Sequence, residues 1–277
     1  MTERKIAERA QESPIDDRGV AMQSKSYSLS CLLAVILCTG LAVPLHARAD
    51  AMECGILKNY QDIGPWDYAD PSSNVPTGAD PMGHVKRVEN VHFTPEIQSL
   101  NLKRFSLDRL TDEIHYTLRI LPNHPGALMA ISRLERMAGG KLPQRTVTPF
   151  TPKITADCFF DRAIRFRPQD KAVRMIHGMH LQQHGMLKEA LAEYEKAQSL
   201  GEDSANLSYN LGLLYAELNN WDKAYEYGEK AQRGGFMLPG LRNRLEKAGR
   251  PLPPPPVTPI PKGTATSSEN VSQDTTE

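Results

Sequence analysis

The feature of this sequence that most constrains its fold is a 34-residue interval between matching small residues. Three pairs share that interval: Gly178 with Gly212, Ala190 with Ala224, and Ala197 with Ala231. Large side chains recur in step with them, Leu181 with Tyr215 and Leu187 with Trp221. Small residues let two helices approach closely, while large ones fill the gaps between neighbouring pairs. The interval therefore predicts an all-α array of stacked antiparallel helix pairs.

This pattern resembles the tetratricopeptide repeat (TPR) family. A large residue follows Gly178 by three positions, and the family's Ala-x3-aromatic-x2-Ala sequence comes next, as Ala190, Tyr194 and Ala197. The resemblance implies a helix-turn-helix solenoid with TPR units at residues 171–204 and 205–236. It is strongest there, although His177, Gly228 and Gly234-Gly235 depart from the residues usual at their positions.

A third unit lies upstream and carries an insertion. Ala156 stands 34 residues before Ala190 and begins the pattern of a second helix, while a first-helix pattern runs from Pro125 to Ala138. Residues 139–152, GGKLPQRTVTPFTP, are too rich in Pro and Gly to be helical. Residues 125–170 are therefore expected to be one repeat with an insertion at 139–152, so the array has about three repeats.

The remaining segments complete the expected organisation. Residues 107–124 are predicted to be a partial leading repeat, and residues 50–106 an irregular N-terminal segment punctuated by Pro and Gly. Residues 237–250 contain a helix that starts at a favoured proline and ends at Gly249, which suits the polar cap that a solenoid needs. Residues 251–277 are expected to form a disordered Pro-rich tail.

The N-terminal 49 residues have the features of a secretory signal peptide. Lys25 precedes an apolar run that ends near Leu45, and Ala47-Arg48-Ala49 offers a small-x-small cleavage site. We expect cleavage after Ala49, with translation starting at Met1 or at Met22. An uncleaved anchor helix is the alternative, but the run is short for a membrane span and contains Pro44. The expected location is therefore periplasmic or secreted, without stable membrane insertion after cleavage.

The cysteine count fits that location. Cys31 and Cys38 lie in the signal, which leaves Cys54 and Cys158 in the mature chain. In an oxidising compartment an isolated pair is most simply one disulfide bond. The alternative is two separate thiols, with Cys158 as a small buried apolar residue.

A binding groove follows from the resemblance, because in this family the first helices of the pairs line a concave surface that receives a peptide or a helix. By position, three helices would contribute four residues each to a peptide-binding groove: Met129, Arg133, Arg136 and Met137; Met175, Met179, Gln182 and Gln183; Asn206, Tyr209, Leu213 and Glu217. Methionine adapts to varied partners and arginine pairs with carboxylates, so we expect a hydrophobic segment with an acidic group at one end. Some of these methionines could instead be ordinary core residues between repeats.

Two further clusters have simple structural explanations. His177, His180 and His184 share one helix face, but no Cys or carboxylate lies at ligand spacing, so no metal site is predicted. The basic residues from Arg162 to Arg174 alternate with aspartates and are expected to form a solvated, salt-bridged face. The sequence contains no catalytic motif, so neither an enzyme nor a cofactor is expected.

The overall balance of charge separates the remaining function classes. The 277 residues carry 33 Lys and Arg against 33 Asp and Glu, which argues against a nucleic-acid binder. The chain resembles small exported TPR proteins of Gram-negative bacteria, which implies a periplasmic scaffold that binds another envelope protein or peptide. The second hypothesis is a structural or oligomerising protein whose groove is filled by its own residues 55–106.

Overall fold

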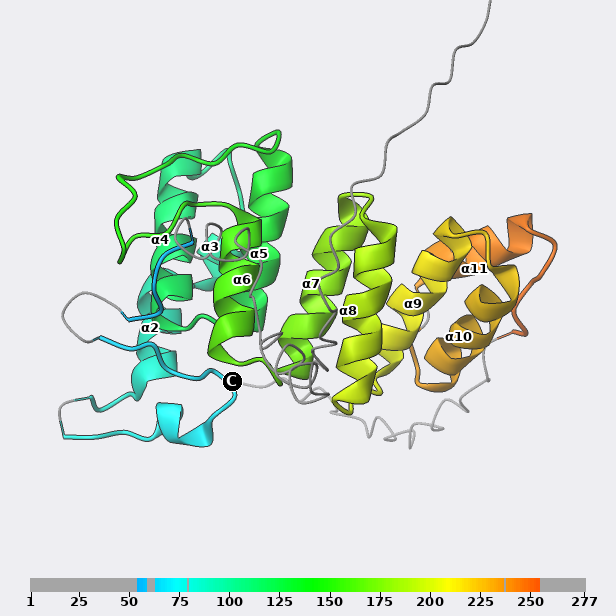
Figure 1. The fold of residues 1–277 in the computed structure, drawn as a ribbon, viewed down its shortest axis with the longest axis horizontal. Coiled ribbons are helices and arrows are strands. Elements are labelled where there is room, and N and C mark those ends of the chain that lie inside the picture. Colours follow the sequence, from blue (N-terminus) through cyan, green and yellow to red (C-terminus); the bar gives the residue numbers. More distant parts are fainter. Residues whose placement is uncertain (1–53, 59–62, 79, 237, 255–277) are drawn as a thin grey trace, which may run out of the picture. The chain divides into compact units, whose positions relative to one another are not determined.

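The computed structural model describes residues 54–58, 63–78, 80–236 and 238–254 (Figure 1). These residues form helices and connecting loops without a strand, apart from an isolated bridge between Thr148 and Thr151. The all-α fold is thereby confirmed. No helix within these ranges has the length and apolar character required to cross a membrane. The predicted export signal and residues 255–277 lie outside the described residues.

Three helix pairs occupy the predicted repeats. Their bounds are α5 (Pro125–Met137) with α6 (Ala156–Phe166), α7 (Lys171–Gln183) with α8 (Leu187–Ser199), and α9 (Ala205–Glu217) with α10 (Trp221–Arg233). The two helices of each pair pack on each other, and the first helices also contact in series, α5 with α7 and α7 with α9. This is the arrangement of a TPR solenoid.

The small residues of the repeat lie where helices approach closely. A Cβ atom on Gly178 would stand 2.6 Å from the ring of Tyr194, which belongs to the second helix of the same pair and is fully buried. Gly212 and Gly228 lie against leucines of the C-terminal cap, and a Cβ on Gly228 would be 3.1 Å from Leu245. The departure from an aromatic residue at position 228 therefore makes room for that cap.

Each first helix begins at a polar side chain that caps its free amides. His124, Asp170 and Ser204 stand directly before α5, α7 and α9, and each accepts a hydrogen bond from a backbone N–H two or three residues later. Such N-caps fix where a helix starts. The insertion at 139–152 lengthens the interval between the first two caps, while the second and third keep the 34-residue period.

The N-terminal segment is more helical than the sequence indicated. It contains η4 (Pro71–Asn74), α2 (His84–His92) and α3 (Pro95–Gln98), followed by α4 (Leu107–Ile120). Helix α2 packs on α4, and Val85 and Val88 are buried in a cluster with Leu121. The expectation of an irregular segment over residues 50–106 thus needs correction for these helices, whose apolar pattern is too short to stand out.

A disulfide bond joins Cys54 to Cys158 of α6, with an S–S distance of 2.04 Å, as the sequence indicated. The side chain of Arg162 is fully buried beside it and donates from Nη1 to the carbonyl oxygens of Cys54 and Ile56. Burial lowers the pKa of Arg162 to about 10. Arg162 therefore anchors the N-terminal segment, and the expectation of a solvated basic face is wrong for this residue.

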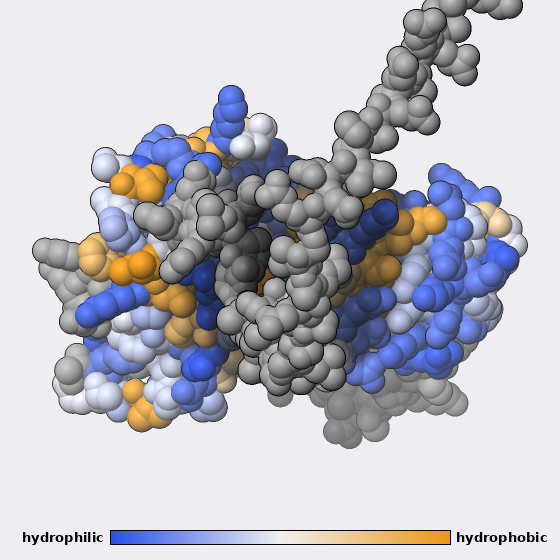
Figure 2. Space-filling model, viewed as in Figure 1, coloured by the Kyte–Doolittle hydropathy of each residue, from blue (hydrophilic) through white to orange (hydrophobic). Residues whose placement is uncertain are grey.

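The helix α11 (Pro239–Lys247) closes the array at the C-terminal end. It packs on α9 and α10, where Leu241 and Leu245 are buried. Leu252 is buried as well, and Gln232 donates to the Pro253 carbonyl, so residues 251–254 pack on α10 rather than begin a disordered tail. The surface over α10 and α11 is mostly hydrophilic, as a cap requires (Figure 2).

Candidate functional site: a methionine-lined pocket

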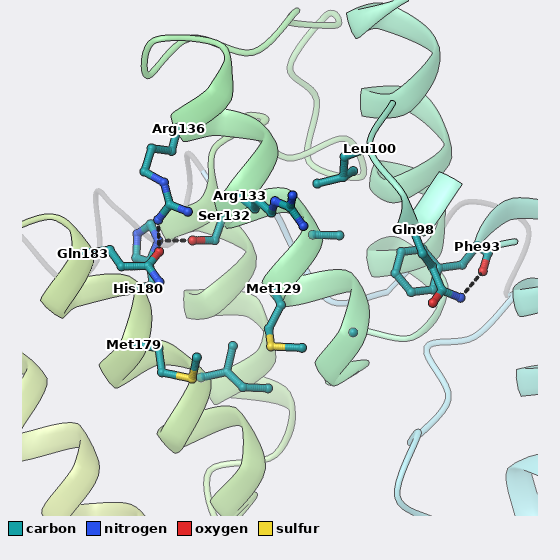
Figure 3. Close-up of a pocket in the computed structure, with 13 residues that line it drawn as sticks. Phe93, Gln98, Leu100, Met129, Ser132, Arg133, Arg136, Met179, His180 and Gln183 are labelled. Atoms are coloured by element: carbon teal, nitrogen blue, oxygen red, sulfur yellow. Dashed lines mark hydrogen bonds between the residues drawn. The ribbon is translucent and has the colours of Figure 1, made fainter. Parts of the chain in front are cut away.

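A cavity of about 320 Å³ lies between α3, α5 and α7. Helix α5 contributes the longest stretch of its lining, α7 forms a second wall, and the chain from Phe93 to Leu100 forms a third. The lining residues are Phe93, Gln98, Leu100, Gly126, Met129, Ala130, Ser132, Arg133, Arg136, Ile176, Met179, His180 and Gln183. Figure 3 shows Arg136 and Gln183 at one end, Phe93 and Gln98 at the other, and Met129 between them.

The walls of the pocket are largely apolar. Ile176 and Met179 come from α7, one turn apart, and Phe93 and Leu100 come from the two ends of the α3 segment. The side chain of Gln98 holds this segment in shape by donating to the Phe93 carbonyl at 2.8 Å. Met129 remains 46% exposed although it faces these apolar groups. The cavity can therefore accept an apolar side chain from outside.

Two arginines of α5 give the pocket a basic edge. Arg136 donates a hydrogen bond to the side-chain oxygen of Gln183, so this arginine is tied to α7. Arg133 is exposed, and within the described residues no carboxylate lies at ion-pair distance from it. The guanidinium of Arg133 is consequently available for an anionic group.

A hydrogen-bond chain that is buried at Ser132 and His180 and exposed at Asp157 lies at the back of the pocket. His180, only 2% exposed, contacts Ser132 Oγ at 2.8 Å through Nδ1 and Asp157 Oδ1 at 3.0 Å through Nε2. The hydrogen bond from His180 lowers the pKa of the Asp157 carboxyl. An imidazole that donates to a carboxylate from Nε2 accepts from the Ser132 hydroxyl at Nδ1. The chain joins α5, α6 and α7 and so fixes the geometry of the pocket.

The structure brings together five of the twelve predicted groove residues. Met129, Arg133, Arg136, Met179 and Gln183 line the cavity. Met137 is exposed on α5 beyond it, Met175 packs partly buried against the second core cluster, and Gln182 accepts a hydrogen bond from Tyr194. These three residues therefore lie on α5 and α7 but outside the lining.

The four predicted residues of α9 do not line this pocket. Tyr209 packs against Phe236, Glu217 pairs with Arg244 of α11, and Leu213 packs partly buried on the second core cluster. Asn206 accepts a hydrogen bond from the side chain of Asn210 on the same helix. Helix α11 packs on α9 as another first helix would. It therefore occupies part of the surface of α9 that was assigned to the groove.

Several pocket residues were missed by the sequence reasoning. Phe93, Gln98 and Leu100 belong to the segment expected to be irregular, and their only signal was the apolar character of Phe93 and Leu100. Ser132 and His180 face inward from positions that the repeat reserves for packing. A buried histidine needs polar partners, and the repeat pattern predicts which helices pack together but not that Ser132 and Asp157 meet the ring of His180.

The histidine cluster forms contacts within the protein. His177 stacks on Phe160 with ring centroids 4.9 Å apart and lies 3.5 Å from a carboxylate oxygen of Glu193. His180 is held by Ser132 and Asp157, and its ring lies 4.4 Å from that of His184. Across the described ranges, no group of three or more metal-ligating side chains is arranged to hold an ion.

Comparisons with known proteins add three solved structures. PilF of Pseudomonas aeruginosa superposes with a TM-score of 0.43 at 18% identity, covering 60% of this chain and 71% of that one. YrrB, described as a TPR protein with an unusual peptide-binding site, superposes with a TM-score of 0.36 at 21% identity, covering 55% of this chain and 71% of that one. MamA of AMB-1 superposes with a TM-score of 0.33 at 15% identity, covering 54% of this chain and 80% of that one. No family model matches the sequence. No curated protein matches it significantly.

The class of this protein follows from its own repeat. Paired helices recur at the 34-residue period, small residues lie at the helix crossings, and α11 caps the end. These features define a TPR-type helical repeat protein. A surface built of stacked helix pairs is typical of scaffolds that bind other proteins.

Proposed function

We propose that this chain is an exported TPR scaffold that binds another envelope protein or peptide through the pocket between α3, α5 and α7. The observation that carries the proposal is the exposure of Met129 in a cavity that also contains Arg133, for which the described part of the chain supplies no ion-pair partner. A methionine that served only the core would be buried as Leu128 and Ile131 are, both at 0% exposure.

The alternative, a structural protein whose groove is filled by its own N-terminal segment, receives less support. Residues Phe93 to Leu100 line one side of the cavity and leave about 320 Å³ beside them. Pockets that receive small molecules start at about 300 Å³. The N-terminal segment thus acts as a wall and leaves space for a partner.

The proposed location rests on two features. Residues 1–49 have the composition of an export signal, and the bond between Cys54 and Cys158 is of the kind that persists in oxidising compartments. Partners available to the pocket would then be other proteins of the envelope.

Site-specific photocrosslinking tests the proposal. A photoreactive amino acid replaces Met129 in the pocket or, as a matched control, Met137 on the same helix. Both methionines are exposed, at 46% and 43%, but only Met129 lines the cavity. In the source cells we expect the photoreactive residue at position 129 to form a defined adduct, and we expect this adduct to disappear when Met179→Glu is added. The residue at position 137 should form no such adduct. Equal adducts at both positions, or none at 129, would contradict a binding role for the pocket.

A further inference from the structure

We infer that the pocket selects a peptide segment in which one bulky apolar side chain lies beside a carboxylate, and that Arg133 pairs with that carboxylate. This inference rests on the proposed function and specifies the ligand chemistry of the same site. It concerns Arg133 rather than Arg136, and it sets the distance between the two recognised groups.

The apolar part of the ligand follows from the walls. Phe93 and Leu100 close the pocket on the N-terminal side, and Ile176 and Met179 close it on the α7 side. A cavity of about 320 Å³ between three walls has room for a large side chain, whereas a whole helix is about 10–12 Å across. The thioethers of Met129 and Met179 favour an aromatic or a long aliphatic group.

The acidic part follows from charge complementarity. Among the described residues, the charged side chains that line the cavity are Arg133 and Arg136, and none of the lining residues is Asp or Glu. The nearby carboxylates are already engaged, because Glu135 accepts from the backbone N–H of Ala156 and Asp157 is bound to His180. Nothing within the described lining therefore neutralises Arg133, and a ligand carboxylate would do so.

The separation of the two groups follows from helix geometry. Arg133 follows Met129 by four residues, so the two side chains lie one above the other on one face of α5. Residues spaced in this way are about 5–6 Å apart at their Cβ atoms. The ligand carboxylate must therefore lie within a few residues of the apolar side chain, because a longer spacing would carry it past Arg133.

Fluorescence anisotropy with short dye-labelled peptides tests the inference. Each Gly/Ser peptide carries one Phe and one Glu at varied separation, and twin peptides replace Glu by Gln or Lys, or Phe by Ala. For the full chain we expect the best Glu peptide to bind about tenfold more tightly than its Gln twin. Arg133→Glu should reverse the preference, so that the Lys twin binds more tightly. Arg233→Glu, an exposed site on α10 outside the pocket, should change nothing.

The outcomes separate this inference from the proposed function. If Phe peptides bind in a manner that Met129→Glu abolishes, but Glu and Gln twins bind equally, the role of Arg133 is refuted and the binding pocket stands. If the Ala twin binds as well as the Phe peptide, the apolar requirement is refuted. If no peptide binds while Met129 still crosslinks to a partner, the ligand chemistry is wrong and the scaffold function stands. Circular dichroism of each variant confirms that it remains folded.

Discussion

The guanidinium of Arg162 donates to the carbonyl oxygen of Cys54 at 3.2 Å, while the sulfur of Cys54 is bonded to Cys158, one helical turn before Arg162 on α6. One residue of the N-terminal segment is thus held at its backbone and at its side chain by the same face of one helix. Arg162 also donates to the Ile56 carbonyl at 2.6 Å, and Ile56 N–H donates to Pro149 of the insertion at 2.8 Å.

This double attachment predicts that Cys54 and Cys158 are oxidised to one disulfide bond in the native protein. In protein that starts at Asp50, denatured without reductant, thiol labelling should find no free cysteine, and reduction should release both Cys54 and Cys158. In the chain-entropy model a bond that closes about 100 residues stabilises by about 4–5 kcal/mol, and measured values are often smaller. Two labelled thiols before reduction would show that the bond is absent.

The contribution of Arg162 can be measured separately. Arg162→Met keeps the buried volume but leaves the carbonyls of Cys54 and Ile56 without their donor. Unsatisfied buried acceptors cost about 1–3 kcal/mol. We expect the free energy of unfolding in urea to fall by that amount, with faster proteolysis between Gly55 and Pro95. Arg165→Met provides a milder control, because Arg165 is half-exposed and donates to Gly55 alone within that segment. Equal losses in both variants would argue against a special role for Arg162.

The close contact at Gly178 predicts that a single methyl group is destabilising. Gly178→Ala places a Cβ 2.6 Å from the ring of Tyr194, which is fully buried and hydrogen-bonded to Gln182. Overpacking of this kind costs about 1–3 kcal/mol, although alanine gains up to about 1 kcal/mol in helix propensity. Thermal unfolding should show a lower Tm. In a Tyr194→Leu background the ring is gone, so the same substitution should be neutral or stabilising, and a double-mutant cycle tests that coupling.

His115 predicts a stability that falls in mild acid. Its ring is 6% exposed on α4, and burial, followed by the nearby cation of Arg119, lowers the pKa of His115 to about 4. The unfolded chain takes up this proton near pH 6.5, so between pH 6.5 and 4 the unfolded state binds more protons than the folded state. The contribution of uncharged His115 to the free energy of unfolding is therefore complete above pH 6.5. It is lost as the pH falls toward 4, and the loss amounts to about 3 kcal/mol.

Urea unfolding at a series of pH values measures this loss. His115→Phe removes the titrating group while keeping an aromatic ring beside Phe159, whose centroid lies 5.9 Å away. The variant should lose most of the slope between pH 6.5 and 4. If its slope equals that of the parent protein, His115 is not the group responsible.

Export is tested by a reporter fusion. Residues 1–60 joined to a reporter that is active only outside the cytoplasm should give activity, and mass spectrometry should find the fusion shortened at Ala49. Replacing Ala47 and Ala49 by bulky residues should block the shortening and leave a longer, membrane-retained fusion. An inactive, full-length fusion would contradict the proposed location in the envelope.

The repeats could be predicted because their information is local. Gly178, Ala190 and Tyr194 belong to the two helices of one pair and mark where these helices approach closely. The fixed interval between such residues is therefore enough to predict the four helices from α7 through α10. Arg162 could not be placed in this way, because its burial depends on Cys54 and Ile56, more than 100 residues earlier. A charged residue amid aspartates has the same local pattern whether it is solvated or enclosed.

The candidate site was predicted in part for the same reason. Met129 and Met179 take first-helix positions that the repeat places on one surface, and both line the pocket. The wall formed by Phe93 and Leu100 depends on how a non-repeating segment packs against α5, which no periodicity encodes. Tyr209 was also assigned to the groove by its first-helix position, 34 residues after Met175, but it lies against Phe236 because the chain ends its array with α11.

The sequence separation of 104 residues between Cys54 and Cys158 has a consequence for biogenesis. A chain made from its N-terminus presents Cys54 long before α6 exists, so that thiol waits unpaired through the synthesis of α2, α4 and α5. Its proper attachment also needs Pro149 of the insertion and Arg162, which are made close to Cys158. Closure of the bond therefore requires that synthesis has passed residue 158, and a chain interrupted before that residue keeps Cys54 without its partner.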